Sequence, residues 1–250
     1  MKKQTKVMWN VGLIGGLLLL LFVLEQILPS GSMLFTVLKK GAIYALVAIG
    51  YTMVYGIIGM INFAHGDVFM IGGYLAFYGV SMFLMPWWLA VCLAIVVTTA
   101  FGVGLERVAY RPLRDSPRIS IMISAIGASF LIENLAIVLF DARPKAFPVP
   151  AFFSQNLIFG GVRVSTVSLI IPLVTALILA VLLWIVHRTK TGMAMRAVST
   201  DIDAARLMAI DVNKIVSITF ALGSALAAVG GSIWATKYPS LAPLEGIMPG

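Results

Sequence analysis

The stretch Gly59-Met60-Ile61-Asn62-Phe63-Ala64-His65-Gly66-Asp67 lies between two long apolar segments and carries amide, imidazole and carboxylate side chains. Polar side chains at membrane depth are costly, so they normally face a protein interior or an aqueous path. The glycines in this stretch allow the chain to break its helix and to expose backbone groups to a cavity. The stretch therefore predicts either part of a substrate path through a membrane protein or a short polar turn between two helices at the membrane surface.

The composition of the chain is that of a membrane protein. Hydrophobic residues make up 60% and charged residues 11% of the 250 residues, and the mean hydropathy is +1.02. The formal net charge is +8, but the basic residues lie between apolar segments, where they set orientation in a membrane. We therefore expect a lipid membrane and no nucleic acid as partner. The single cysteine excludes an intrachain disulfide framework.

A helix needs roughly 20 apolar residues to cross the bilayer core. Seven segments of about that length can be drawn, over residues 11–28, 41–61, 68–85, 87–105, 119–140, 168–187 and 215–235. The first follows three lysines and has no small-residue cleavage site, so we interpret it as an uncleaved helix. The prediction is an all-α, polytopic transmembrane bundle that forms a single domain over residues 1–250.

Basic residues predict the orientation of this bundle. With the amino terminus in the cytoplasm, the inside segments hold 12 Lys and Arg residues and the outside segments hold 6. This bias favours the stated orientation over its inverse. Lys39 and Lys40, placed outside, are its weakest point.

Small residues recur at helical spacing in two of the predicted spans and indicate close helix packing. In the second span they are Gly41, Ala45, Ala48, Thr52, Gly56 and Gly59, and in the seventh Thr219, Gly223, Ala227 and Gly230. Outside the spans, three prolines interrupt residues 141–150, each removing a backbone donor. That segment is expected to form a rigid outer cap, with either a docking role or the role of a solvated connector.

The inside loop over 188–214 is patterned. Thr200 followed by Asp203 resembles a capping box, and the acidic residues suit the positive end of a helix. A helix over 200–210 would carry small apolar side chains on or beside one face: Ile202, Ala204, Ala205 and Ala209. Such a helix suits insertion into a groove on another protein, or it lies on the membrane surface.

The run Asp203-Ala204-Ala205-Arg206-Leu207-Met208-Ala209 resembles the loop by which permeases of ABC importers dock on their ATP-hydrolysing subunit, with Ala209 where glycine is usual. The motifs GMINFAHGDVFMIGGY (59–74), ISAIGASFLIEN (123–134) and TKTGMAMRAVSTDIDAARLMAIDV (189–212) extend the likeness across nearly the whole chain. Together they resemble a permease subunit of the branched-chain amino acid ABC transporters. Members of that family continue beyond an equivalent of residues 247–250, so we expect this chain to lack the family's C-terminal segment.

The resemblance implies a transport subunit of the bacterial inner membrane rather than an enzyme. Its implied partners are cytoplasmic ABC ATPases, a second related permease and a periplasmic amino-acid-binding protein. No phosphate-binding loop of the G-x-x-x-x-G-K-[ST] type occurs in the chain. We therefore expect no cofactor on this chain and ATP on the partner subunits.

The candidate substrate path combines the polar stretch with a polar pair in the fifth span. Its residues are Asn62, His65, Gly66, Asp67, Glu133 and Asn134. The candidate ATPase-coupling residues are Asp203, Ala204, Ala205 and Ala209. We expect neither catalytic residues nor a metal site.

Two alternatives remain open from the sequence. Related permeases carry urea, short amides or nucleosides, so the cargo could differ. The chain could also be a channel or secondary transporter that works without ATP, with Asp67, His65 and Glu133 as an ion or proton relay. The helix over 200–210 argues against the second alternative, because a lone channel would not need it.

Overall fold

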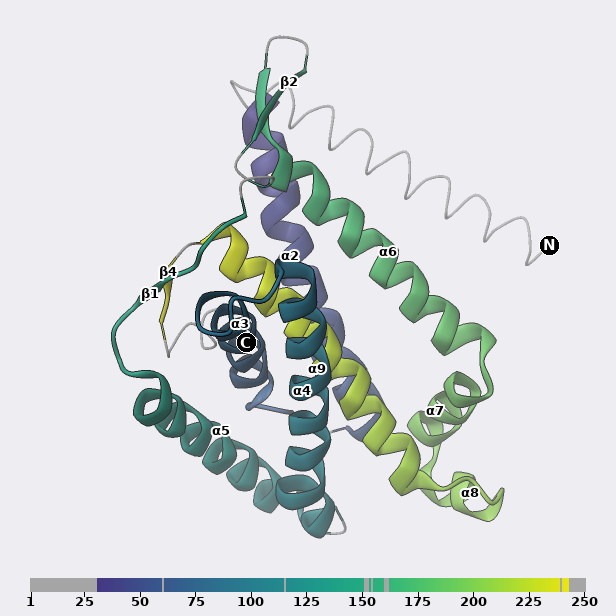
Figure 1. Ribbon diagram of the computed structural model, residues 1–250. Helices are drawn as coiled ribbons and strands as arrows, with labels where there is room; N and C mark the ends of the chain where they lie inside the picture. The colour runs from purple at the N-terminus through teal and green to yellow at the C-terminus, as the bar shows by residue number, and fades with distance from the viewer. Residues whose placement is uncertain are drawn as a thin grey trace, which may run out of the picture.

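The computed structural model describes residues 31–59, 61–114, 116–150, 153, 155–159, 162–238 and 240–242, and most of them are helical (Figure 1). Five helices are long and apolar enough to cross a membrane. They lie in α2 (Gly31–Ile58), α4 (Trp87–Leu105), α5 (Arg118–Phe140), α6 (Thr166–Arg188) and α9 (Val212–Lys237). This confirms the predicted all-α membrane bundle.

The predicted number of seven spans is not confirmed. The segment 11–28 lies outside the described residues. The segment 68–85 corresponds to α3 (His65–Ser81), which has 17 residues and is shorter than the five spanning helices. The second span was also predicted to begin too late, because α2 already contains Lys39 and Lys40, which were expected in a loop.

The bundle has two distinguishable ends (Figure 1). At one end, α6 is followed by α7 (Lys190–Thr200) and α8 (Ile202–Leu207), and α4 continues into the π-helix η1 (Glu106–Tyr110) and the short η2 (Arg111–Leu113). We call this the α8 end. Because η1 and η2 extend α4 to Leu113, the connection before α5 is shorter than the predicted loop over 107–118.

The opposite end, which we call the strand end, is held by two short antiparallel strand pairs. Strand β1 (Lys145–Ala146) pairs with β4 (Ser240–Leu241), and β2 (Asn156–Phe159) pairs with β3 (Val162–Ser165). Phe147 is buried here, and the hydroxyl of Tyr74 donates a hydrogen bond of 3.3 Å to the backbone oxygen of Leu241. The proline-containing segment thus packs on the helices as a cap.

Helix α9 runs through the middle of the bundle. In its most apolar window 67% of the residues are buried, against 17–28% in the other spanning helices. A Cβ added to Gly72 of α3 would overlap Ala228, and one added to Gly231 would meet Phe69, so the two helices touch backbone to backbone. The stripe Thr219, Gly223, Ala227 and Gly230 is buried, as predicted.

The corresponding prediction for α2 is wrong for contacts within this chain. Gly41, Ala48, Thr52 and Gly56 are exposed, and a Cβ added at Gly41 or Gly56 would meet nothing within 4 Å. The buried face of α2 is instead formed by larger side chains, among them Ile43, Leu46 and Val47.

Candidate functional site

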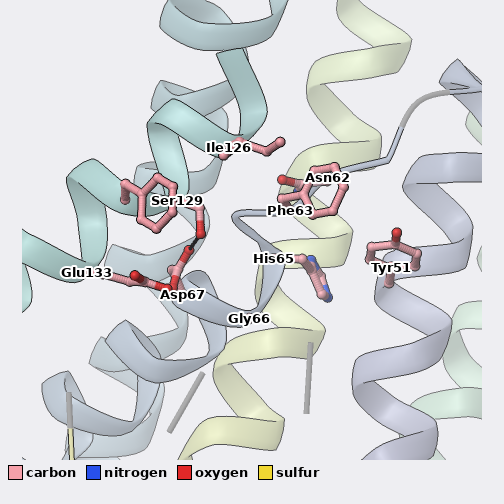
Figure 2. Close-up of a pocket in the computed structure, with 10 residues that line it drawn as sticks. Tyr51, Asn62, Phe63, His65, Gly66, Asp67, Ile126, Ser129 and Glu133 are labelled. Carbon is pink, nitrogen blue, oxygen red and sulfur yellow. Dashed lines mark hydrogen bonds between the residues drawn. The ribbon is translucent and has the colours of Figure 1, made fainter. Parts of the chain in front are cut away.

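A cavity of about 390 Å³ opens where α2, α3 and α5 meet (Figure 2). It combines polar and apolar walls. The residues that line it are Tyr51, Asn62, Phe63, His65, Gly66, Asp67, Ile126, Ser129, Phe130 and Glu133. Five of the six residues predicted for the substrate path, all except Asn134, therefore meet in one place.

The cavity exists because the helix breaks where the sequence predicted. Helix α2 ends at Ile58, Gly59 has a φ of +69°, and the next helix begins only at His65. The positive φ is one that glycine adopts readily and other residues rarely do. The connection returns toward the middle of the bundle before α3 starts.

The position of His65 between α2 and α9 argues against a turn at the membrane surface. A Cβ added to Gly50 of α2 would lie 3.0 Å from His65 Nε2 and 3.1 Å from the backbone oxygen of Gly223 in α9. At 1.5 Å of rise per residue, Gly50 lies about 12 Å from the end of α2 at Ile58, and Gly223 about 16 Å from the start of α9 at Val212. In a hydrocarbon core about 30 Å thick, α3 thus begins near mid-depth.

Asp67 and Glu133 bring two carboxyl groups to this cavity from facing helices (Figure 2). Asp67 lies in the first turn of α3 and is only 3% exposed. Ser129 of α5 donates a hydrogen bond of 2.6 Å to Asp67 Oδ2, and Glu133 lies one helical turn farther along α5. Ionisable side chains in membrane-spanning segments normally face the bundle interior or an aqueous cavity, and these two carboxyl groups do so.

The amino-terminal end of α3 supplies the opposite polarity. Its N-cap, Ala64, has no side-chain hydrogen bond to the first turn, and Gly66, two residues later, lines the cavity without a side chain. Free backbone N–H groups and the helix dipole make such an end attractive to anions. The cavity therefore offers positive and negative groups a few residues apart.

His65 is almost fully buried at 2% exposure and lies edge-on to the ring of Tyr51, with centroids 6.1 Å apart. Within the described residues, its Nε2 has no hydrogen-bond partner. A buried polar atom without a partner is costly, so a ligand or a water molecule at this atom would be stabilising.

Asn62 is held by a residue that the sequence did not identify. The hydroxyl of Tyr110 in η1 donates a hydrogen bond of 2.6 Å to Asn62 Oδ1, and both residues are buried. No local pattern marks Tyr110, because its partner is 48 residues away. Ser129 was also missed, although its spacing of four residues from Glu133 places both on one helix face.

The prediction for Asn134 is wrong as far as the cavity is concerned. Asn134 is exposed, and its Nδ2 donates a hydrogen bond of 2.7 Å to the backbone oxygen of Phe130 on the same helix. Adjacent residues of a helix point about 100° apart, so Glu133 and Asn134 could not both face the cavity.

The predicted coupling helix is shorter than expected and is capped by another residue. Asp201, not Thr200, accepts hydrogen bonds from the backbone N–H groups of Asp203 at 2.9 Å and Ala204 at 3.0 Å. Thr200 ends α7, and its hydroxyl donates to the backbone oxygen of Arg196. Ala209 has a φ of +58°, a left-handed conformation that suits the glycine usual at this position.

The expectation that Ala205 lies on the outward face is also wrong. Ala205 is 3% exposed and belongs to the same hydrophobic cluster as Tyr110, Met195 and Phe220. The opposite face of α8 is open: Leu207 is 88% and Met208 77% exposed. The outward apolar groups are therefore Leu207 and Met208, beside Asp203 and Ala204.

A buried ion pair ties η1 to the first turns of α9. Glu106 is fully buried, and Arg114 Nη2 lies 2.6 Å from its Oε1. Ser217 donates a hydrogen bond of 2.8 Å to Glu106 Oε2, and Arg114 donates one of 2.6 Å to Asn213. Because Tyr110 lies in the same π-helix, the segment after α8 is connected through η1 to the wall of the cavity.

Among the described residues there is no group of three or more His, Cys, Asp or Glu side chains that could hold a metal ion.

Comparison with known proteins gives a consistent result. Residues 33–248 match the family model described as the permease component of the branched-chain amino acid transport system. The chain is 42% identical over 226 residues to the high-affinity branched-chain amino acid transport system permease protein BraD of Pseudomonas aeruginosa, which covers 85% of this chain and 73% of that protein.

Two further relatives are named for different substrates, one for branched-chain amino acids, like BraD, and one for ribose. Identity is 38% over 239 residues to the permease protein LivH of Escherichia coli, covering 90% of this chain and 77% of LivH. The ribose import permease protein RbsC of Haemophilus influenzae is 26% identical over 237 residues, or 92% of this chain and 70% of that protein. No solved structure matches the chain.

Proposed function

The chain belongs to the family of permease components of branched-chain amino acid transport systems, and from this membership we propose how it moves its substrate. It is a multi-pass membrane permease rather than an enzyme. We propose that the amino acid crosses the membrane through the cavity around Asp67. One observation carries this proposal: polar groups of both signs gather at mid-depth, in a cavity of about 390 Å³.

The substrate is a zwitterion with an apolar side chain, and the cavity has a counterpart for each part. Asp67 and Glu133 suit the ammonium group, and the amino-terminal end of α3 at Gly66 suits the carboxylate. Phe63 and Ile126 form an apolar wall for the branched side chain. A small solute with one charge would leave half of these groups unmatched, and buried unmatched charge is unfavourable.

Transport energy comes, in this proposal, from ATP hydrolysed on separate cytoplasmic subunits, and this chain carries no cofactor. Support comes from the exposed apolar pair Leu207 and Met208 at the end of α8, with Asp203 and Ala204 beside them. Large apolar side chains in the centre of a contact surface are common anchors of protein interfaces. Closure of the ATPases would move α8 together with α9 and η1, because Ala205 and the Glu106–Arg114 pair attach them.

The remaining partners follow from the family and from the exposed surfaces. We propose a location in the bacterial inner membrane with the α8 end in the cytoplasm, a periplasmic binding protein at the strand end, and a second related permease beside this one. The exposed small residues of α2, such as Ala48 and Gly56, permit close approach of a helix from another chain.

The test is uptake of radiolabelled leucine by proteoliposomes that contain the complete importer and its binding protein. Asp67→Asn and Glu133→Gln remove a charge each without changing size, and Asp141→Asn at the exposed end of α5 is the matched control. A hydrogen bond to a charged group contributes about 1.5–3 kcal/mol, so uptake by the cavity variants should fall roughly 10- to 100-fold. Uptake unchanged in both variants would remove the cavity from the path.

The same experiment separates the rival function. An ion or proton relay through Asp67 and His65 would transport without nucleotide and would depend on an imposed proton gradient. An importer driven by ATP would not transport without nucleotide, and its uptake would not depend on a proton gradient. Competition of leucine uptake by unlabelled urea, nucleosides or ribose tests whether other cargo fits the cavity.

A further inference from the structure

The α8 end contains a second cavity, of about 420 Å³, between α4 with its extension into η1 and η2 and the first turns of α9. Its cationic groups come from both walls: Arg107 and Arg111 from one, Lys214 from the other. All three side chains are exposed. We propose that this cavity binds the phosphate headgroup of an anionic phospholipid.

The charge of the cavity is not neutralised by its neighbours. Glu106, the acidic residue next to Arg107 in the sequence, is fully buried and paired with Arg114. Asp211 is the only acidic residue that lines the cavity within the described part of the chain, and its Oδ1 accepts the backbone N–H of Lys214 as the cap of α9. Three cations against one carboxylate leave a net positive cavity.

The floor of the cavity and its depth indicate a lipid rather than a soluble anion. Toward the bundle the lining changes to Val103, Ile218 and Ala221, which lie one to two helical turns deeper in the spanning segments than the cations. Cations at the membrane interface above an apolar groove match a headgroup that continues into acyl chains. A soluble phosphate would use the cations and leave the apolar floor without a partner.

The experiment is lipid retention by the full-length chain in its importer complex, purified from nanodiscs with phosphatidylglycerol and phosphatidylcholine in equal amounts. The pocket variant is Arg107→Gln with Lys214→Gln, one cation from each wall. The matched control is Arg188→Gln with Lys190→Gln, which removes the same charge from exposed positions at the same end, outside the cavity. Native mass spectrometry counts the phospholipids that stay bound.

The wild type and the control should retain phosphatidylglycerol in preference to phosphatidylcholine. The pocket variant should bind phosphatidylglycerol about thirtyfold more weakly, since each cation near the surface contributes about one kcal/mol, or a factor of five to six. Equal losses in pocket variant and control would show a general surface attraction and overturn the site. Unchanged phosphatidylglycerol retention in the pocket variant would also overturn the site. So would displacement of the lipid by inorganic phosphate at low concentration. A pocket variant that loses an ATPase subunit but keeps its lipid would assign the cations to the ATPase contact instead.

Discussion

At the scale of single residues, the polar groups around the cavity and at the α8 end are mostly paired. Asp67 accepts from Ser129, Asn62 accepts from Tyr110, and Glu106 pairs with Arg114. His65 differs, because its Nε2 is buried and has no hydrogen-bond partner within the described residues. Among the described residues that line the cavity, His65 Nε2 is thus the buried polar atom available to a ligand, while the ring also interacts with the backbone of Val47.

The first prediction concerns His65. Replacing it with Leu should reduce leucine uptake several-fold, because the cavity loses its polar atom, and should leave assembly with the ATPase intact. Folding stability should fall by less than about 1 kcal/mol, since the ring gives up its backbone interaction with Val47 while Nε2 has no described partner. Uptake by proteoliposomes and the melting temperature in detergent measure the two effects. A fall in abundance and melting temperature, equivalent to about 1–3 kcal/mol, would instead show that His65 holds the helices together.

The second prediction concerns Tyr110. Changing it to Phe removes the hydrogen bond to Asn62 and keeps the ring packed on Phe220, at a centroid distance of 5.2 Å. The free energy of unfolding should fall by about 1 kcal/mol. Uptake should fall further than stability explains, because Asn62 loses the contact that positions it at the cavity. ATP hydrolysis by the complex should remain.

The control is Tyr78→Phe, which removes a hydroxyl from the last turns of α3, away from the cavity. Equal uptake by the Tyr110 and Tyr78 variants, at equal abundance in the membrane, would contradict a positioning role for Tyr110.

At the scale of elements, one face of α8 packs into the core and the other is exposed. Ala205 is packed into the chain's own core, while Leu207 and Met208 are exposed. A helix of six residues cannot be stable alone, so its position depends on the cap by Asp201 and on the inward alanine. Helix α8 is thereby attached to the core firmly enough to transmit a movement of a bound partner to the bundle.

The third prediction separates these two faces. Leu207→Glu should leave insertion and melting temperature unchanged and abolish co-purification of the ATPase. Ala205→Glu should lower the melting temperature and abundance, because it buries an unpaired charge at a cost of about 3 kcal/mol or more. Ser199→Glu adds the same charge at an exposed position on α7 and serves as the control. Normal co-purification of the ATPase with Leu207→Glu would exclude α8 as the docking element.

At the scale of the whole molecule, α9 is the axis around which the other helices pack. Its small residues bring the backbone of α3 into contact, and the two run side by side from mid-depth to the strand end (Figure 1). Helix α5 stands farther from this centre and closes one side of the cavity. A shift of α5 against α3 would therefore change access to Asp67 with little disturbance of the core.

The fourth prediction tests orientation. In a Cys92→Ser background, which removes the exposed native cysteine, Ala142→Cys at the strand end should react with an impermeant thiol reagent added to intact cells. Ser199→Cys at the α8 end should react only after the cells are opened. Both positions are exposed, so access decides the reaction. The reverse labelling would invert the protein in the membrane, and α8 could not then reach a cytoplasmic ATPase.

The sequence by itself determined the class of the protein, the approximate positions of five spanning helices, the helix break before His65 and the family. Each of these depends on a local pattern: the length of an apolar run, a glycine next to polar residues, or a motif within one segment. The tertiary structure decided the depth of His65, the contact between Tyr110 and Asn62, the outward exposure of Asn134 and the inward face of α8. The reason is physical: lipid and protein interior are both apolar, so the residue pattern of a membrane helix does not reveal which face another helix covers.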